Sequence, residues 1–397
     1  MNKSTPIKKV SIQLLVLWAA IAISAVSFAQ NTTRHYILYE GTYTAGESKG
    51  IYAYRYDADT GSQQALGLAA ATENPSFLVS DRTHKHLYAV NETGNFEGKS
   101  SGAVTAFSID TKTARLSRLG QVASEGADPC YISIDRSGKY LLVANYTGGT
   151  VAVLPILPGG KLGEASSVVA DKGTLGPNKE RQEKPHAHWI EASARDRFAY
   201  VSDLGLDRVL IYKFDAATGK LSRGESGSAG SDFFSAQLAP GTGPRHVAFS
   251  ANGKYMYVLG ELDATVTVFA NNNETYRSIQ KIPSLPKDFS GQNTAAEIVI
   301  HPSGKFLYTS NRGADSITEF SIDHATGKLS LIGHVSTFGK APRHFTLDPT
   351  GTRLFVANQD TGNIVEYNVD ANTGKLSRTG KMEAVPSAVC LVFVPAD

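Results

Sequence analysis

The chain has 397 residues, of which 39 are Lys or Arg and 37 are Asp or Glu, giving a formal net charge of +2. Three of those lysines lie in the first 29 residues; without them 36 basic residues face 37 acidic ones, a net charge of −1. A nearly neutral chain gives no electrostatic reason to expect nucleic acid or an anionic membrane surface as a partner. The length suffices for one large all-β unit or for two smaller domains.

Residues 1–29 have the composition of a secretory signal peptide. Lysines at the start precede a mostly apolar run from Val10 to Val26, and Ser27-Phe28-Ala29 offers a small-x-small cleavage site. This pattern is typical of a segment that is removed on export, with an uncleaved membrane anchor as the alternative. We therefore expect cleavage after Ala29, a periplasmic or secreted location, and no membrane contact by the mature chain.

From residue 35 onwards the chain repeats a unit of about 50 residues. The copy at Gly243–Leu262 is typical: Tyr255, Tyr257 and Leu259 alternate as in a half-buried strand, after an Asn252-Gly253 hairpin turn. No long stretch after residue 30 has helical periodicity. A period near 50 with four strands per unit predicts an all-β protein, a β-propeller. The equivalent positions, separated by 54, 56, 59, 52, 46 and 44 residues, are Pro75, Pro129, Pro185, Pro244, Ala296, Pro342 and Pro386.

The two ends of the chain contain complementary parts of one repeat. Residues 35–43 match a second strand and Gly50–Tyr56 a third, whereas residues 386–394 match a first strand without the rest. We expect residues 387–394 to pair with residues 35–43, because closing the ring would remove exposed sheet edges. Six complete repeats and one shared blade make seven, so residues 30–397 are predicted to form a single seven-bladed β-propeller domain.

Two other features bear on this architecture. Cys130 and Cys390 fall on first strands two repeats apart, too distant for a disulfide, which needs Cα atoms within about 7 Å; we expect two buried thiols. Residues 171–184 are a polar insertion punctuated by Gly and Pro, directly before Pro185-His186-Ala187-His188. The insertion is predicted to be a loop, either a lid or wall over the central funnel or a solvated connector.

One face of the predicted propeller should carry the chemistry. In each blade the first strand is innermost and the second is antiparallel to it, so the start of one and the end of the other share a face. These positions are mostly polar, whereas the opposite hairpin ends are common turns. The face is predicted to present Ser76, Cys130, His186, Arg245, Glu297, Arg343 and Ser387, with Glu40, Glu92, Asn145, Asp203, Glu261, Asn311, Arg312, Asn358 and Gln359 from the second strands.

This ring combines arginines with proton-transfer groups. Arginine forks suit a carboxylate or phosphate, and Glu or His can move protons. The combination predicts an anionic small molecule that is held by arginines and acted on by a Glu or His, with a pore-sealing Arg–Glu network as the alternative. His186 and His188 alternate to one side of a strand and could bind a metal, but no third ligand is indicated, so we expect no metal site.

Twelve short motifs are spread along the repeats. They are Gly41-Thr42-Tyr43, Asn74-Pro75-Ser76, Ala144-Asn145-Tyr146, Gly176-Pro177-Asn178, Arg181-Gln182, Pro185-His186-Ala187-His188, Ser202-Asp203-Leu204-Gly205, Gly243-Pro244-Arg245-His246, Glu261-Leu262, Ala296-Glu297-Ile298, Ser310-Asn311-Arg312-Gly313 and Ala357-Asn358-Gln359. Together they resemble the lactonase-type seven-bladed propeller family, which includes propeller 6-phosphogluconolactonases and fungal carboxy-cis,cis-muconate cyclases. The resemblance covers nearly all of residues 35–394, and it implies opening or closing of a lactone ring without a metal or cofactor.

The resemblance also implies site residues. In the cyclase branch the proposed site uses a His, two Arg and a Glu, and the matching positions are His186 or His188, Arg245, Glu261 and Arg312. We expect Glu261 or a His to activate water and an Arg to stabilise the oxyanion. The expected catalytic residues are Glu261, His186, His188 and Arg312, and the expected substrate contacts are Arg245, Glu297, Arg343, Arg181, Asn145 and Asp203.

The function expected from this resemblance is hydrolysis of a sugar-acid lactone, similar to that of a 6-phosphogluconolactonase. A lactonising cyclase, or a non-catalytic propeller that binds an anionic ligand or a protein, is the alternative, because propellers host many unrelated functions. The expected partner is a small anionic lactone or sugar acid, and the expected state is a monomer. The phosphogluconate step belongs to cytosolic metabolism, whereas a signal peptide indicates export. We therefore expect the substrate to be an extracellular sugar-acid or aromatic-derived lactone that carries a carboxylate.

Overall fold

The structure is a computed structural model that describes residues 1–3, 34–223, 235–272 and 275–397. The predicted signal peptide and its cleavage site therefore lie almost entirely outside the described residues. Internal contacts divide the chain into Met1–Thr33 and Arg34–Asp397, and all of the described strands belong to the second unit. Among the described residues, no helix combines the length and the apolar character needed to cross a membrane.

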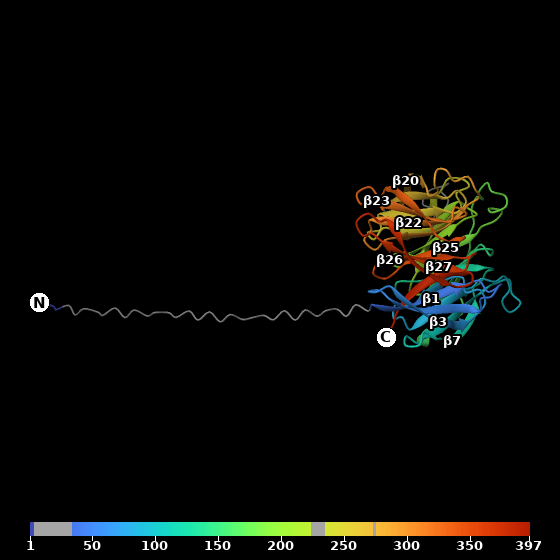
Figure 1. The fold of residues 1–397 in the computed structure, drawn as a ribbon, viewed down its shortest axis with the longest axis horizontal. Coiled ribbons are helices and arrows are strands. Elements are labelled where there is room, and N and C mark those ends of the chain that lie inside the picture. Colours follow the sequence, from blue (N-terminus) through green and yellow to red (C-terminus); the bar gives the residue numbers. More distant parts are fainter. Residues whose placement is uncertain (4–33, 224–234, 273–274) are drawn as a thin grey trace. The chain divides into compact units, whose positions relative to one another are not determined.

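In the described part of Arg34–Asp397, the strands form seven antiparallel sheets, the predicted blades (Figure 1). Blade 1 contains β29 (Ala388–Pro395), β1 (His35–Thr42), β2 (Gly50–Asp57) and β3 (Ser62–Ala71). Blade 2 contains β4 (Leu78–Ser80), β5 (His86–Asn91), β6 (Ala103–Ile109) and β7 (Leu116–Ala123). Blade 3 contains β8 (Pro129–Ile134), β9 (Tyr140–Asn145), β10 (Thr150–Pro155) and β11 (Ser167–Ala170), with a short 3-10 helix at Pro158–Gly160.

The remaining blades follow in chain order. Blade 4 contains β12 (Ala187–Ala192), β13 (Phe198–Asp203), β14 (Arg208–Asp215), β15 (Lys220–Arg223) and β16 (Ser235–Gln237), which pairs with β14. Blade 5 contains β17 (Pro244–Phe249), β18 (Tyr255–Gly260), β19 (Thr265–Asn272) and β20 (Thr275–Pro283). Blade 6 contains β21 (Thr294–Ile300), β22 (Phe306–Arg312), β23 (Ser316–Ile322) and β24 (Leu329–Ser336). Blade 7 contains β25 (Pro342–Leu347), β26 (Arg353–Asn358), β27 (Asn363–Val369) and β28 (Leu376–Ala384).

The first strands of the blades form a closed ring. Contacts run from β4 to β8, β12, β17, β21, β25 and β29, and from β29 back to β4. The ring is closed by β29 pairing with β1, where Tyr36 lies opposite Pro395 and Thr42 opposite Ala388. In Figure 1 the blue N-terminal strand accordingly lies beside the red C-terminal elements. The predicted pairing of the chain ends is confirmed.

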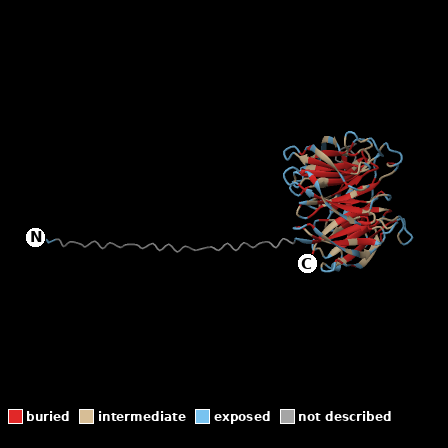
Figure 2. Cartoon of the chain, in the orientation of Figure 1, coloured by how far each residue is buried: buried red, intermediate tan, exposed pale blue. Residues whose placement is uncertain are grey.

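The blades pack through buried aromatic side chains, and burial is concentrated in the strands while the loops are exposed (Figure 2). Tyr257 of blade 5 donates a hydrogen bond from its phenol to the carbonyl of Gly327 in blade 6, at 3.0 Å. Tyr308 of blade 6 bonds in the same way to Gly374 of blade 7, at 2.7 Å. Both glycines have positive φ, and a Cβ at Gly327 would lie 2.3 Å from the ring of Tyr255. Glycine is therefore required where these turns meet the preceding blade.

Cys130 and Cys390 are both buried free thiols, on β8 and β29 respectively. Burial raises the pKa of Cys390 to about 12. The burial predicted for the two cysteines is confirmed.

A β-bulge recurs at the start of the first strands. In blades 3 to 7 the register between the first and second strands shifts within the first few residues, for example between Pro244 and Val247 and between Pro342 and His344. A bulge inserts one extra residue and re-aims the side chains beside it. The strict alternation expected from the sequence is therefore wrong at the strand starts that border the funnel.

Candidate functional site

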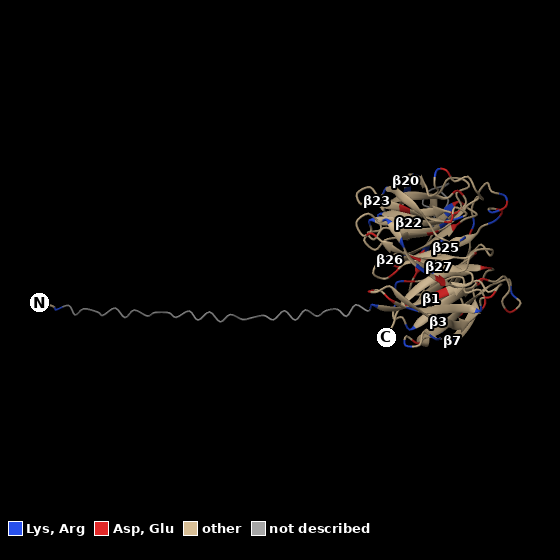
Figure 3. Ribbon diagram, viewed as in Figure 1, with Lys and Arg blue, Asp and Glu red and all other residues tan. Residues whose placement is uncertain are grey.

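Glu261 is the centre of the polar cluster on the predicted face. The residue directly follows the last residue of β18, and its side chain is only 4% exposed. Arg181 donates to Oε1 at 2.6 Å, while Nε of Arg245 and Nη2 of Arg312 lie 3.1 and 3.3 Å from Oε2. These arginines come from the 171–184 insertion, from β17 and from the end of β22. Three segments remote in sequence therefore converge on one carboxylate, whereas most charged residues lie on the loops between strands (Figure 3).

The arginines determine the charge of this centre. Burial alone would raise the pKa of Glu261, but the charges of Arg312, Arg245 and Arg181 outweigh it and lower the pKa to about 2. The carboxylate is therefore ionised at neutral pH. A carboxylate this acidic is a poor proton acceptor, because an efficient general base has a pKa near the working pH. Its surroundings suit an anchor for cations better than the water-activating role expected from the sequence.

Of the two candidate histidines, the structure places His188 against Glu261. Nε2 of His188 lies 3.8 Å from Oε2 of Glu261. Burial and the nearby Arg245 hold the pKa of His188 well below its ordinary value, so the ring is neutral. His186 instead stacks on Tyr146 with ring centroids 4.4 Å apart, and its Nε2 lies 3.1 Å from the carboxylate of Glu183. The ring of His188 also contacts Tyr146, edge to face with centroids 5.4 Å apart.

A pocket of about 460 Å³ adjoins this centre. Arg181 and Arg312 line the pocket and reach Glu261 from it, so the carboxylate lies behind the two guanidinium groups. The insertion supplies part of the wall, and Arg181 is steadied there by a hydrogen bond to the phenol of Tyr146 at 3.1 Å. The full lining is Asn178, Arg181, Leu262, Gln292, Asn293, Thr294 and Arg312.

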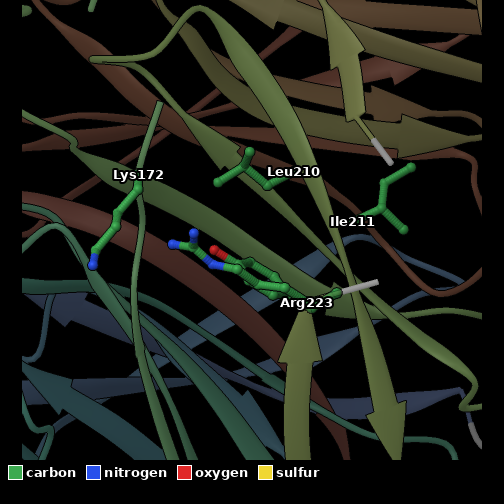
Figure 4. Close-up of a pocket in the computed structure, with 5 residues that line it drawn as sticks. Lys172, Leu210, Ile211 and Arg223 are labelled. Atoms are coloured by element: carbon green, nitrogen blue, oxygen red, sulfur yellow. The ribbon is translucent and has the colours of Figure 1, made fainter. Parts of the chain in front are cut away.

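A second pocket, between Lys172, Arg223 and the β14 residues, is shown in Figure 4. Its volume is about 10 Å³, which is about the room taken by one water molecule. None of the funnel residues lines it. This pocket is too small to hold a metabolite.

Glu297 forms a second buried cluster, which the sequence did not predict. Its carboxylate lies 3.0 Å from Nδ1 of His246 and 3.6 Å from Nε2 of His344. Burial raises the pKa of Glu297. Burial also lowers the pKa of His344 to about 4 and that of His246 well below its ordinary value. The two rings are therefore neutral partners of this glutamate.

Arg343 lies in a separate polar group. Its Nη2 is 4.0 Å from Oε2 of Glu92, and its guanidinium lies over the ring of Tyr43, 5.3 Å from the centroid. The phenol of Tyr43 donates to both oxygens of Glu92 at 2.9 Å. The funnel thus offers a fourth guanidinium group, which lies against Glu92 and not against Glu261.

Two of the expected substrate contacts hold the backbone instead. Asn145 is fully buried and donates to the carbonyl of Ser124 at 2.8 Å. Asp203 is fully buried and accepts from the backbone N–H groups of His186 and Leu206, each at 3.0 Å. Nδ2 of Asn145 and Oδ1 of Asp203 are thus used by the chain, and the substrate contacts expected of these two residues stay a prediction.

His246 and His344 are the main residues that the sequence reasoning missed. Each follows an arginine in the same tripeptide, Pro-Arg-His, at residues 244–246 and 342–344. Strict alternation would turn the residue after the arginine away from the funnel. The bulge turns both residues inward, and the repeated tripeptide was the signal that could have indicated them.

The architecture and this cationic funnel define a class, that of propellers with a polar site at one end of the ring. The family model described as "Lactonase, 7-bladed beta-propeller" matches residues 37–393. The chain belongs to this family. Within the described residues, no group of three or more His, Cys, Asp or Glu side chains is arranged to hold a metal ion.

Several named proteins are similar to this chain. A 6-phosphogluconolactonase of Bacillus subtilis is 35% identical over 315 residues, which are 79% of this chain and 85% of the relative. A 6-phosphogluconolactonase of Formosa agariphila is 33% identical over 301 residues, 75% of this chain and 82% of the relative. The solved structure of a periplasmic gluconolactonase from Pseudomonas aeruginosa is 33% identical, with a TM-score of 0.84, and the match covers 91% of this chain and 100% of that one.

Proposed function

We propose that this chain is a lactonase that hydrolyses an anionic sugar-acid lactone at the arginine-lined pocket. The observation that carries the proposal is the arrangement at Glu261: three guanidinium groups and a neutral imidazole surround one ionised carboxylate. Two of those arginines open into a pocket of about 460 Å³, the size range of sites for small ligands. The relatives named 6-phosphogluconolactonase and gluconolactonase support the same reaction class.

In this proposal the arginines bind the lactone and stabilise its transition state. Negative charge develops on the carbonyl oxygen when water attacks the ester carbon. Fixed N–H donors in a site shielded from water stabilise such an oxyanion strongly. Arg312 is suited to this role, because it lines the pocket while its other contacts, with Glu261 and the carbonyl of Ala295, hold it in place. Arg181 would then contact the acidic group of the substrate.

His188 is the proposed proton acceptor. The lowered pKa of His188 makes its resting ring a weak base, so in this proposal the negative charge that develops on the lactone raises that basicity as the new C–O bond forms. The ring then takes the proton from the attacking water, and Glu261 would stabilise the resulting imidazolium, as a carboxylate does for a catalytic histidine. The tetrahedral intermediate then collapses, the ring C–O ester bond breaks, and the imidazolium returns the proton to the leaving alkoxide. The product is the open-chain hydroxy acid. We expect a larger loss of kcat for His188→Gln than for His186→Gln, and an equal or larger loss for His186→Gln would contradict this choice of histidine.

The charge of the funnel favours an acidic lactone. Four arginines outnumber the three carboxyl groups of Glu261, Glu92 and Glu297 beside them. A site lined by an excess of one charge attracts a ligand of the opposite charge. A lactone that carries a carboxylate or phosphate should therefore bind better than glucono-1,5-lactone.

Export is part of this proposal. The N-terminal composition is that of a signal peptide, and one similar protein is a periplasmic gluconolactonase. An exported enzyme would meet carboxylated lactones outside the cytoplasm. Mass spectrometry of the mature protein from an expressing bacterium should show a chain that begins at Gln30; a chain that retains residues 1–29 would contradict export by cleavage.

The decisive experiment is a lactone panel assayed for acid release. Glucono-1,5-lactone, 6-phosphogluconolactone and glucaro-lactones would be compared with the spontaneous rate, for the wild type and Arg312→Ala. We expect catalysis that is fastest for acidic lactones and that depends on Arg312. If no lactone opens faster than its spontaneous rate, the lactonase proposal is wrong. If 6-phosphogluconolactone is hydrolysed efficiently and carboxylated lactones are not, the substrate proposed from export is wrong.

A further inference from the structure

We infer that His246 and Glu297 are positioning residues that fix the guanidinium of Arg245 against Glu261. The catalytic consequence of this inference rests on the proposed lactonase function, whereas the geometric part stands on the buried contacts alone. The contacts form a chain from one carboxylate to the other. Glu297 holds His246 at 3.0 Å, His246 holds Arg245 at 3.2 Å, and Arg245 lies 3.1 Å from Glu261.

The direction of the hydrogen bonds in this chain follows from arginine. A guanidinium group can only donate, so Nε2 of His246, which faces Nη1 of Arg245, must accept and carries no proton. The proton of the neutral ring is then on Nδ1, where both oxygens of Glu297 lie within 3.1 Å. Glu297 therefore selects the one tautomer of His246 that can accept from Arg245. This is the known effect of a carboxylate on the tautomer of a histidine.

The ring of His246 is also fixed mechanically. Tyr131, His188 and Phe77 meet it edge to face, with centroids 5.1, 5.3 and 6.0 Å away. Glu297 is itself held by the backbone N–H of Ile298, which donates to its Oε1 at 3.0 Å. Arg245, His246 and Glu297 are all buried. Turning any of these side chains away would break a contact of a buried polar group, which costs free energy.

The position of Arg245 affects Glu261 and His188, the two groups of the proposed proton-transfer step. Arg245 contributes to the charge that keeps Glu261 ionised and His188 neutral. If its guanidinium rotates away, Glu261 keeps Arg181 and Arg312 but loses the contact of Arg245 with Oε2, the oxygen that lies nearest to His188. A misplacement of about 1 Å in such a group can lower catalysis by about a hundredfold.

A matched pair of variants tests this inference. His246→Phe and His344→Phe both keep an aromatic ring at the mutated position, and both remove a histidine from Glu297. Of the two histidines, only His246 contacts Arg245. We expect kcat/KM for the best lactone of the panel to fall about 10- to 100-fold in His246→Phe and much less in His344→Phe. His246→Gln, which keeps one donor and one acceptor, should recover part of the loss. Equal losses in the two Phe variants would overturn the inference.

A double-mutant cycle separates positioning from direct action. If His246 acts through Arg245, then His246→Phe should add little to the loss already caused by Arg245→Ala, because coupled residues are not additive. Additive losses would show that His246 acts independently.

A crystal structure of His246→Phe gives a readout that needs no activity. The guanidinium of Arg245 should leave Oε2 of Glu261, and in His344→Phe it should stay. If His246→Phe does not fold, the structure of His246→Gln replaces it. Arg245 should then stay at Oε2 of Glu261 if the amide oxygen of the introduced glutamine accepts a hydrogen bond from it, and should leave if the amide turns away. An unmoved Arg245 in His246→Phe would refute the inference, whereas a wild type without lactonase activity would refute only the proposed function.

Discussion

Two glutamates of the funnel, Glu261 and Glu297, differ in charge although they share a residue type and a degree of burial. Their side chains are 4% and 8% exposed. Glu261 is surrounded by three guanidinium groups that are charged at neutral pH, whereas Glu297 lies against two neutral imidazoles. The pKa of the first is lowered to about 2 and that of the second is raised.

The difference shows that burial alone does not determine the state of a carboxyl group. Desolvation disfavours the charged form in both cases, and only a nearby permanent charge reverses its effect. Glu261 is therefore a fixed negative charge that organises cations, whereas Glu297 acts through hydrogen bonds to its histidines. Proton transfer in the proposed reaction then depends on the histidine next to Glu261, not on either glutamate.

The largest expected effect separates the two histidines that lie beside the two carboxylates. His188→Gln should lower kcat by about 10²- to 10⁴-fold, the usual contribution of a general base. His344→Gln, next to Glu297, removes the same kind of ring and should lower kcat far less. Steady-state kinetics on the best lactone measures both. Similar losses of kcat at the two positions would contradict the claim that proton transfer takes place beside Glu261 and not beside Glu297.

The next effect concerns stability. Glu261→Gln leaves three guanidinium groups without their common counter-charge, and breaking a buried ion pair in this way costs about 3–5 kcal/mol. Glu297→Gln replaces a carboxyl whose buried partners are neutral, and should cost about 1 kcal/mol, as for a neutral hydrogen bond. Urea unfolding followed by tryptophan fluorescence gives both free energies. A larger loss for Glu297→Gln would contradict the assigned charge states.

The pH dependence of stability should have opposite signs for the two glutamates. The pKa of Glu261 is lower in the folded state, so its contribution is present above the ordinary Glu pKa and is lost as the pH falls towards 2. The stability difference between wild type and Glu261→Gln should therefore shrink below about pH 5, by up to about 3 kcal/mol.

Glu297 behaves in the reverse manner, because its folded-state pKa is raised. The wild type should lose stability relative to Glu297→Gln as the pH rises from the ordinary Glu pKa through the raised one. Comparing each variant with the wild type at the same pH largely cancels the contribution of the buried histidines. Parallel pH profiles for the two differences would show that the two carboxyls share one environment.

The smallest effect distinguishes the arginines on the two sides of the funnel. Arg312→Ala removes a charge-assisted contact worth about 1.5–3 kcal/mol, which corresponds to a loss of about 10- to 100-fold in kcat/KM. Arg343→Ala should act mainly on KM, and only for lactones with an additional acidic group, because Arg343 does not contact Glu261. Kinetics with charged and uncharged lactones tests both; a loss from Arg343→Ala that is independent of substrate charge would contradict this assignment.

The sequence was sufficient to predict the blades and their closure, because each blade repeats a local pattern of alternation and turns. It also placed Glu261, Arg245 and Arg312 on one face, since strand ends in a regular sheet are positioned by register. It could not place His246 or His344, because a one-residue bulge reverses the side to which a residue points. Nor could it predict that Glu261 is a weak base, since that depends on distances to arginines up to 80 residues away in the chain.

The closure of blade 1 also sets an order for assembly. Of the described strands, β29 is the last in the chain. It nevertheless forms the innermost strand of the blade that contains β1, the first strand. During synthesis, the edge of β1 that pairs with β29 therefore stays unpaired until nearly the whole propeller has been made. Until then this edge can pair with strands of other chains. The ring can become a barrier to aggregation only at the end of translation, and the shared blade makes completion of the chain a condition for a closed molecule.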